Sequence, residues 1–328
     1  MLATLPRSAV EHYRKGQQLK AVTVAAVRRS WDTLRPTGTW GDQFGRLSPQ
    51  ILALLSAAQL AAVRQSDAYT VAVLAETGVD PDAGPVLNPG GFVATAGNGL
   101  PVADLLPFAV TRAGDTYAAG ASEAQALQAG RDWLDMFVET LLADTIRAAT
   151  SSGMTAHRRA GGYVRMLNPP SCSRCTILAG KFYRWNTGFQ RHPRCDCVHI
   201  PAREALAGDL TTNPNAYFDS LTAAEQDRIF TKAGAQAIRD GADISQVVNA
   251  RAGMSTAQIN PLTGRSVGRL QTVDVYGRRA YITTTSTTKR GRAYRPRSVR
   301  LMPESIYDLA AGDREEAIRL LRLHGYLI

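Results

Sequence analysis

The chain has 328 residues, of which 45% are hydrophobic and 20% charged, an ordinary composition for a folded globular protein. Its length indicates about two domains, and we expect no membrane span because the sequence has no uninterrupted run of about 18 apolar residues. The N-terminus lacks the apolar core of a signal peptide, so we expect a reducing cytoplasm rather than an oxidising compartment.

The first 150 residues predict a helical domain. A helical pattern extends from Ser8 to about Leu34, with basic residues interleaved among the apolar ones. A second helix is predicted to begin at Ser48-Pro49, with serine as the cap and proline in the first helical position, and to extend to Glu76. Its many alanines favour close helix packing.

A break and a third long helix complete this domain. The stretch 80–101 is rich in proline and glycine and predicts a surface loop, and a short helix is expected over 102–119. Ser122 and Gln125 have the spacing of a capping box, and the helix after them is amphipathic. We expect its outer face to be polar; this face comprises Asp132, Asp135, Glu139, Asp144 and Arg147. For Asp132 and Asp135 we expect neither a basic nor a metal partner.

Small, polar and basic residues at 151–162 predict the domain boundary. We therefore expect a helical domain, 1–150, and a second domain, 151–328. The predicted fold class is α+β: a mainly helical N-terminal region followed by a small α+β domain with a cysteine-rich, zinc-binding knuckle. After the knuckle we expect, in order, a helix capped by Thr222 and Glu225 that extends to about Arg239, a short helix capped by Asp243, a hairpin of 272–275 with 280–284, and a C-terminal helix capped by Asp313.

All four cysteines lie in one module, 163–201. Cys172 and Cys175 are spaced C-x-x-C, and Cys195 and Cys197 are spaced C-x-C. Two paired thiol clips joined by a loop are the usual way to enclose a tetrahedral zinc ion. His192 and His199 flank the second clip and are alternate ligands, because imidazole also suits zinc.

Other interpretations of the four cysteines stay open. They are also compatible with reduced thiols packed in a core, with one or two disulfides, or with a catalytic thiol. Strand character is expected at 163–167 and 198–200, with Pro201 ending the second strand. If 195–199 is extended, Cys195, Cys197 and His199 point to one face.

The positive charge is concentrated near the C-terminus. The formal net charge is +10, and the segment 264–300 contains ten basic residues but a single acid, Asp274. Arginines can contact phosphates bidentately, so this basic segment predicts non-specific nucleic-acid binding. A solvated basic linker or an acidic protein partner would explain it equally. The candidate nucleic-acid contacts are Arg278, Arg279, Lys289, Arg290, Arg292, Arg295, Arg297 and Arg300.

The cysteine module carries a resemblance to a known family. Cys172-x-x-Cys175, then Leu178-x-Gly180, then His192-Pro-x-Cys-x-Cys197 with Pro201 soon after, resembles the MuF-like phage head-morphogenesis proteins. The C-terminal runs 300–307 and 321–326 look like the tail of MuF-like minor capsid proteins of actinobacterial phages. The close resemblance covers 163 to the C-terminus, and the N-terminal helices match only in general character.

The resemblance implies a minor capsid protein inside the phage head, assembled in the host cytoplasm. Its implied partners are the portal protein, the major capsid or scaffold protein and genome DNA, without a membrane. Some relatives are labelled capsid maturation proteases, which is the alternative function. The sequence contains none of the common nucleophile, zinc-protease or phosphate-loop motifs, so we expect no catalysis.

Overall fold

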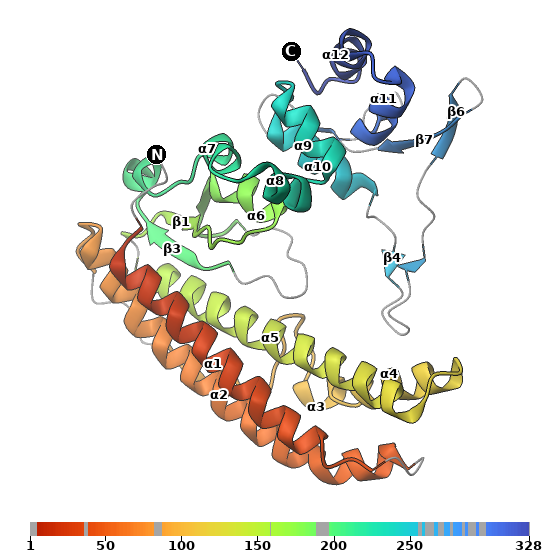
Figure 1. The fold of residues 1–328 in the computed structure, drawn as a ribbon. Coiled ribbons are helices and arrows are strands. Elements are labelled where there is room, and N and C mark those ends of the chain that lie inside the picture. Colours follow the sequence, from red (N-terminus) through yellow and green to blue (C-terminus); the bar gives the residue numbers. More distant parts are fainter. Residues whose placement is uncertain are drawn as a thin grey trace. The chain divides into compact units, whose positions relative to one another are not determined.

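The computed structural model describes residues 5–35, 39–81, 87–157, 159–187 and 197–254, short strands between 258 and 294, and residues 300–327 (Figure 1). The chain divides into two compact units. The bundle unit comprises Ala3–Asn168 and Lys181–Thr211, and the C-terminal unit comprises Pro169–Gly180 and Thr212–Ile328. The division therefore does not fall at residue 150: the helix there continues to Ala156, and the strands that follow it pack on the helices.

Three long helices build the bundle unit, and they lie side by side (Figure 1). They are α1 (Arg7–Trp31), α2 (Trp40–Glu76) and α5 (Glu123–Ala156). Between α2 and α5 the chain forms a 3₁₀ turn η1 (Pro89–Phe92) and two short helices, α3 (Val102–Leu105) and α4 (Phe108–Ala118). Pro107 separates α3 from α4, where we expected one helix. Apolar side chains from all these helices form the core, including Trp31, Leu55, Leu106, Ala109 and Leu142.

The second helix differs from its prediction at its start. α2 begins at Trp40 and passes through Pro49, so Ser48 is not its cap. Proline cannot donate to the carbonyl four residues earlier, that of Gly45. Gly45 and Pro49 are both solvent-exposed, so water can replace the missing donor. Within the described part of the chain, α2 is also a helix whose length and composition would suffice to cross a membrane.

Two charged residues predicted on the polar face of α5 are buried instead. Asp135 lies in the α1–α5 interface, where Arg28 holds its carboxylate through Nε and Nη2 at 2.6–3.0 Å. The prediction that Asp135 has no basic partner is therefore wrong. Arg147 is also buried, and it pairs with Asp144 at 2.7 Å. The apolar stripe of α5, in contrast, is buried as predicted, from Leu134 to Thr145.

A small antiparallel sheet completes the bundle unit. Its strand order is β2 (Phe182–Arg184), β1 (Gly162–Arg165), β3 (His199–Ala202), and the 3₁₀ turn η2 (Glu204–Asp209) follows β3. Pro201 does not end the second strand, because it pairs with Tyr163 inside β3. One face of the sheet packs on α1 and α2 through a second core: Ala9, Tyr69, Val73, Val164, Met166, Val198 and Ile200.

The C-terminal unit contains short helices and a second small sheet. Its helices are α6 (Ser173–Ala179), α7 (Pro214–Asp219), α8 (Ala223–Phe230), α9 (Lys232–Arg239), α10 (Ile244–Met254), α11 (Pro303–Ala310) and α12 (Arg314–Leu323). The predicted helix from Thr222 to Arg239 is split at Thr231, which has a φ of 69°. Thr231 accepts a hydrogen bond from the Gly234 N–H and so caps α9.

The predicted hairpin is present in this unit. β6 (Thr272–Val275) pairs with β7 (Arg278–Thr283), and β7 pairs with β10 (Arg300–Leu301). Two further strand pairs are β4 (Gln258–Ile259) with β5 (Ser266–Val267), and β8 (Ser286–Thr287) with β9 (Ala293–Tyr294). The described chain is thus mostly helical with small antiparallel sheets, which confirms the α+β class at that level.

Candidate functional site

The first cysteine clip begins a helix in the C-terminal unit. Cys172 is the cap of α6, and its Sγ accepts a hydrogen bond from the Cys175 N–H at 3.4 Å. Cys175 is buried, whereas Cys172 is exposed. Gly180 ends α6, where an added Cβ would lie 2.9 Å from Cδ of Pro214. The first cysteine thus caps the turn that contains the second, and close packing against Pro214 leaves no room for a side chain at Gly180.

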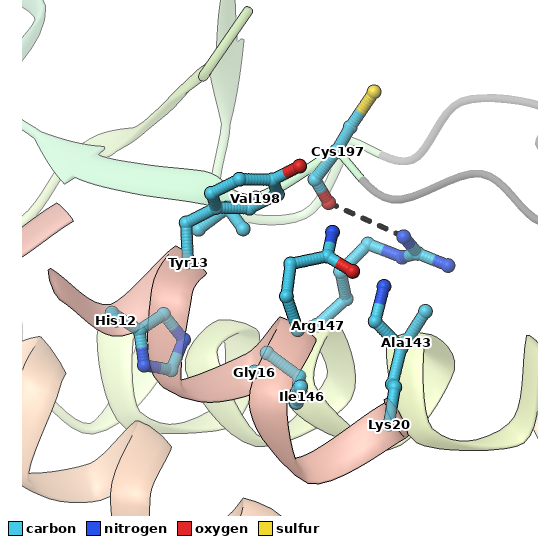
Figure 2. A pocket seen from close by; sticks show the side chains of 10 residues that line it. His12, Tyr13, Gly16, Lys20, Ala143, Ile146, Arg147, Cys197 and Val198 are labelled. Carbon is cyan, nitrogen blue, oxygen red and sulfur yellow. Dashed lines mark hydrogen bonds between the residues drawn. The ribbon is translucent and has the colours of Figure 1, made fainter. Parts of the chain in front are cut away.

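The second clip is anchored to the bundle unit through its backbone. The buried Arg147 guanidinium donates to the Cys197 carbonyl at 3.2 Å, and this bond is drawn in Figure 2. The Cys197 sulfur points away from the pocket residues beneath it (Figure 2). Arg147 is itself oriented by its ion pair with Asp144. A buried arginine on α5 thus holds the backbone at Cys197, at the start of the described segment 197–254.

His199 is held from three directions in the same unit. The Tyr69 hydroxyl donates to its carbonyl at 2.9 Å. The Ser151 hydroxyl lies 3.2 Å from its Nδ1, and the Tyr163 ring stacks on its imidazole with centroids 4.0 Å apart. If His199 were to bind a metal, Nε2 would be the nitrogen to do so, because Nδ1 faces a hydroxyl.

A second buried histidine lies next to this anchor. His12 of α1 stacks on Tyr69, with centroids 4.0 Å apart, and its Nδ1 is 3.3 Å from Nε2 of Gln65. Burial, assisted by Lys15, lowers the pKa of His12 to about 4, so the ring is neutral at physiological pH. His12, Lys20, Arg147 and Cys197 border a small pocket with a volume of about 10 Å³, shown in Figure 2. Such a cavity has room for about one water molecule, not for a substrate.

The predicted zinc ligands are only partly described. Cys172 and Cys175 belong to the C-terminal unit and Cys197 and His199 to the bundle unit, whereas Cys195 and His192 lie outside the described residues. Within the residues that the structure describes, no three His, Cys, Asp or Glu side chains are grouped to hold a metal ion. The four-cysteine zinc site therefore stays a prediction.

The predicted nucleic-acid contacts are described in part. Arg278 and Arg279 lie in β7, opposite Val275 and Asp274 of β6. Arg300 lies in β10, opposite Thr283 of β7. The remaining five lie outside the described residues: Lys289, Arg290, Arg292, Arg295 and Arg297. The hairpin thus brings two of the arginines onto one strand, and the DNA contact itself stays a prediction.

Sequence reasoning missed the residues that hold the second clip. Arg147 is 50 residues from Cys197, and Ser151 and Tyr69 are 48 and 130 residues from His199. A partial signal was present, because Arg147 and Ser151 are one helical turn apart and therefore share a face of α5. Comparison with known proteins gives no relative: no family model, no curated protein and no solved structure matches the chain.

Proposed function

We propose that this chain is a minor capsid protein of a phage head, of the MuF-like type, with a structural role in assembly. The observation that carries the proposal is the sequence pattern Cys172-x-x-Cys175, Leu178-x-Gly180 and His192-Pro-x-Cys-x-Cys197. A Cβ added at Gly180 would lie 2.9 Å from Cδ of Pro214, which supports a structural reason for the glycine of that pattern. The proposed partners are the portal and the major capsid or scaffold protein, during assembly in the host cytoplasm and then inside the virion head.

Co-expression tests this function. The chain is expressed with the portal and major capsid proteins that the resemblance implies as its partners, and procapsids are purified by sedimentation. We expect the chain to co-purify with the portal in a few copies per particle and the capsid protein to keep its length. Absence from both portal and particles would contradict the proposal. Shortening of a head protein that depends on the cysteines would favour the alternative, a maturation protease.

A structural zinc ion is the proposed cofactor. Thiolates of Cys172, Cys175, Cys195 and Cys197 would hold it tetrahedrally, with His192 or His199 as alternates. The capped turn at Cys172 and the Arg147 contact at Cys197 support a fixed backbone at each clip. Zinc would add its binding free energy to folding.

Elemental analysis of the tag-free protein tests the cofactor. We expect one equivalent of zinc in the parent, and Cys195→Ser should lower both the metal content and the melting temperature. Ser171→Ala, next to the first clip but without a thiol, is the control and should keep its metal. Well under one equivalent in the parent would exclude the site.

The basic segment is the proposed DNA contact. If about five of its bases engage duplex DNA, log–log plots of affinity against salt should have a slope of about −4 to −5. Replacing Lys289, Arg290, Arg292, Arg295 and Arg297 by Gln should flatten that slope. A matched control removes five exposed arginines elsewhere, and it should leave the slope unchanged: Arg14, Arg46, Arg112, Arg203 and Arg228. Equal slopes for the two variants would assign the charge to a protein partner.

A further inference from the structure

The outer face of α2 is apolar along most of the helix and is not covered by the described residues. Between Arg46 and Arg64 the helix carries no charge. Only 33% of its most apolar 18-residue stretch is buried. Exposed or half-exposed apolar residues lie on one side of the helix in two runs, before and after Arg64, and together they are here called the α2 stripe: Pro49, Ala53, Ala57, Leu60, Ala61, Ala68, Val71, Ala72 and Ala75.

A stripe of this kind is costly to leave in water. From Pro49 to Ala75 it extends for about 39 Å at the rise of an α-helix. Exposed apolar side chains that gather on one side of a helix are a feature of interaction sites. Its alanines would let a second helix approach to about 8 Å, at the close end of helix packing. The stripe therefore fits a helix better than a small molecule.

Two charged residues interrupt the stripe and identify the partner. Arg64 is exposed and Asp67 is half-exposed, and within the described chain neither has an ion-pair or hydrogen-bond partner for its side chain. Leu60, Arg64, Asp67 and Val71 follow the spacing i, i+4, i+7, i+11, so they lie along one edge of the stripe. We propose that the α2 stripe binds the same stripe of a second copy, with the two α2 helices antiparallel.

The pairing follows from two-fold symmetry. If the axis passes between Gln65 and Ser66, Arg64 lies opposite Asp67 of the partner subunit, and the reciprocal pair forms on the other side of the axis. The same register sets Leu60 opposite Val71 of the partner subunit. Residues on one edge of an antiparallel pair meet the same edge of the other helix, so both contacts form together. One symmetric arrangement thus pairs both charges and covers the apolar surface.

A lipid bilayer is the competing occupant, and it fits less well. The opposite face of α2 is locked in the core of the bundle unit through Ile51, Leu55, Val63 and Leu74. Insertion as a single span would expose that core, and surface binding would bury mainly alanine methyl groups. Interfacial helices carry large apolar residues on the lipid side and basic residues on the other. The stripe has an aspartate and a single arginine instead.

Sedimentation equilibrium of the full chain over a range of concentrations tests the proposal. We expect the parent to form a dimer. Arg64→Asp and Asp67→Arg should each weaken self-association about tenfold or more, because each places like charges opposite one another. When the two variants are mixed, opposite charges meet at both positions, so a heterodimer should form with about the parent affinity. Arg112→Asp, the same change on the exposed face of α4, should leave association unchanged.

Several outcomes would overturn the proposal. A parent that stays monomeric at all concentrations excludes the dimer, and its flotation with anionic phosphatidylglycerol vesicles would assign the stripe to a membrane. Variants that keep the parent affinity, or a mixture that fails to associate, exclude this register. All three substituted proteins should keep the parent's helical circular dichroism, because the positions are exposed or half-exposed.

Discussion

The carboxylate of Asp135 is buried in the bundle unit, and Arg28 is its counter-ion. The two partners are unequally exposed, because the Arg28 side chain is half in solvent and that of Asp135 is 5% exposed. Removing the arginine leaves a buried charge uncompensated, whereas removing the charge on Asp135 lets Arg28 turn to water. Breaking such a pair costs about 3–5 kcal/mol when both charges are buried, and solvent screening reduces this here.

We therefore predict that Arg28→Met lowers the free energy of unfolding by about 2 kcal/mol, more than Asp135→Asn does. The double variant should recover part of the loss. Urea unfolding of the three variants measures these differences. Lys15→Met, which removes the partner of the exposed Glu11, is the control and should have no measurable effect. Equal losses for the two single variants would contradict the argument.

His12 makes the stability of the bundle unit depend on pH. Its pKa is lowered from an ordinary 6.5 to about 4 in the folded chain, first by burial and then by Lys15. His12 of the unfolded chain therefore takes up a proton below pH 6.5, whereas His12 of the folded chain takes one up only near pH 4. The contribution of neutral His12 to the free energy of unfolding is fully present above pH 6.5 and is lost as the pH falls towards 4.

We predict that lowering the pH from 7.5 to 5 removes about 2 kcal/mol of stability through this histidine. His12→Phe keeps a ring on Tyr69 but cannot take up a proton. Its free energy of unfolding should therefore fall less than that of the parent over the same range. Urea unfolding at several pH values measures both slopes, and parallel slopes would show that His12 does not titrate in this way.

At the scale of elements, local capping chemistry was predicted correctly and helix boundaries set by tertiary contacts were not. Ser122 with Gln125 and Thr222 with Glu225 form the capping boxes expected from their spacing, and Asp313 caps α12. These signals work because the interacting atoms are at most three residues apart. The residues of the first turn alone therefore suffice to predict where such a helix begins.

The wrong boundaries have a different physical origin. The start of α2 depends on Trp40 and Phe44, which are buried in the bundle unit and extend the helix nine residues before Pro49. The break at Thr231 depends on distant groups too, because its hydroxyl is bonded by Arg251 at 2.8 Å. Nothing local to Thr231 indicates a φ of 69° in a residue with a branched side chain. The contacts of the candidate site also have no local signal in the sequence, because Arg147 and Tyr69 bind groups that are 50 and 130 residues away.

At the scale of the whole molecule, the bundle unit needs chain from beyond the predicted boundary. Its second core joins Ala9, Tyr69 and Val73 of the helices to Val164 and Ile200 of the sheet. A fragment ending at residue 150 would expose Tyr69 and Val73, which are 5% and 0% exposed in the full chain. Burial of each such side chain contributes about 1.5–3 kcal/mol.

We predict that the fragment 1–211, which contains all of the bundle unit, unfolds cooperatively in urea. The fragment 1–150 should be less stable by about 4 kcal/mol or more and should bind hydrophobic dyes, because the helix faces that pack on the sheet are open to solvent. Ile200→Ala within 1–211 is the intermediate case, since it deletes one buried contact between sheet and helices and should cost about 2–4 kcal/mol. If 1–150 unfolded cooperatively at the same urea concentration as 1–211, the sheet would contribute nothing to the stability of the helices. In that event the boundary expected from the small, polar residues at 151–162 would describe the folding unit after all, because only an independent helical core keeps its stability without the strands.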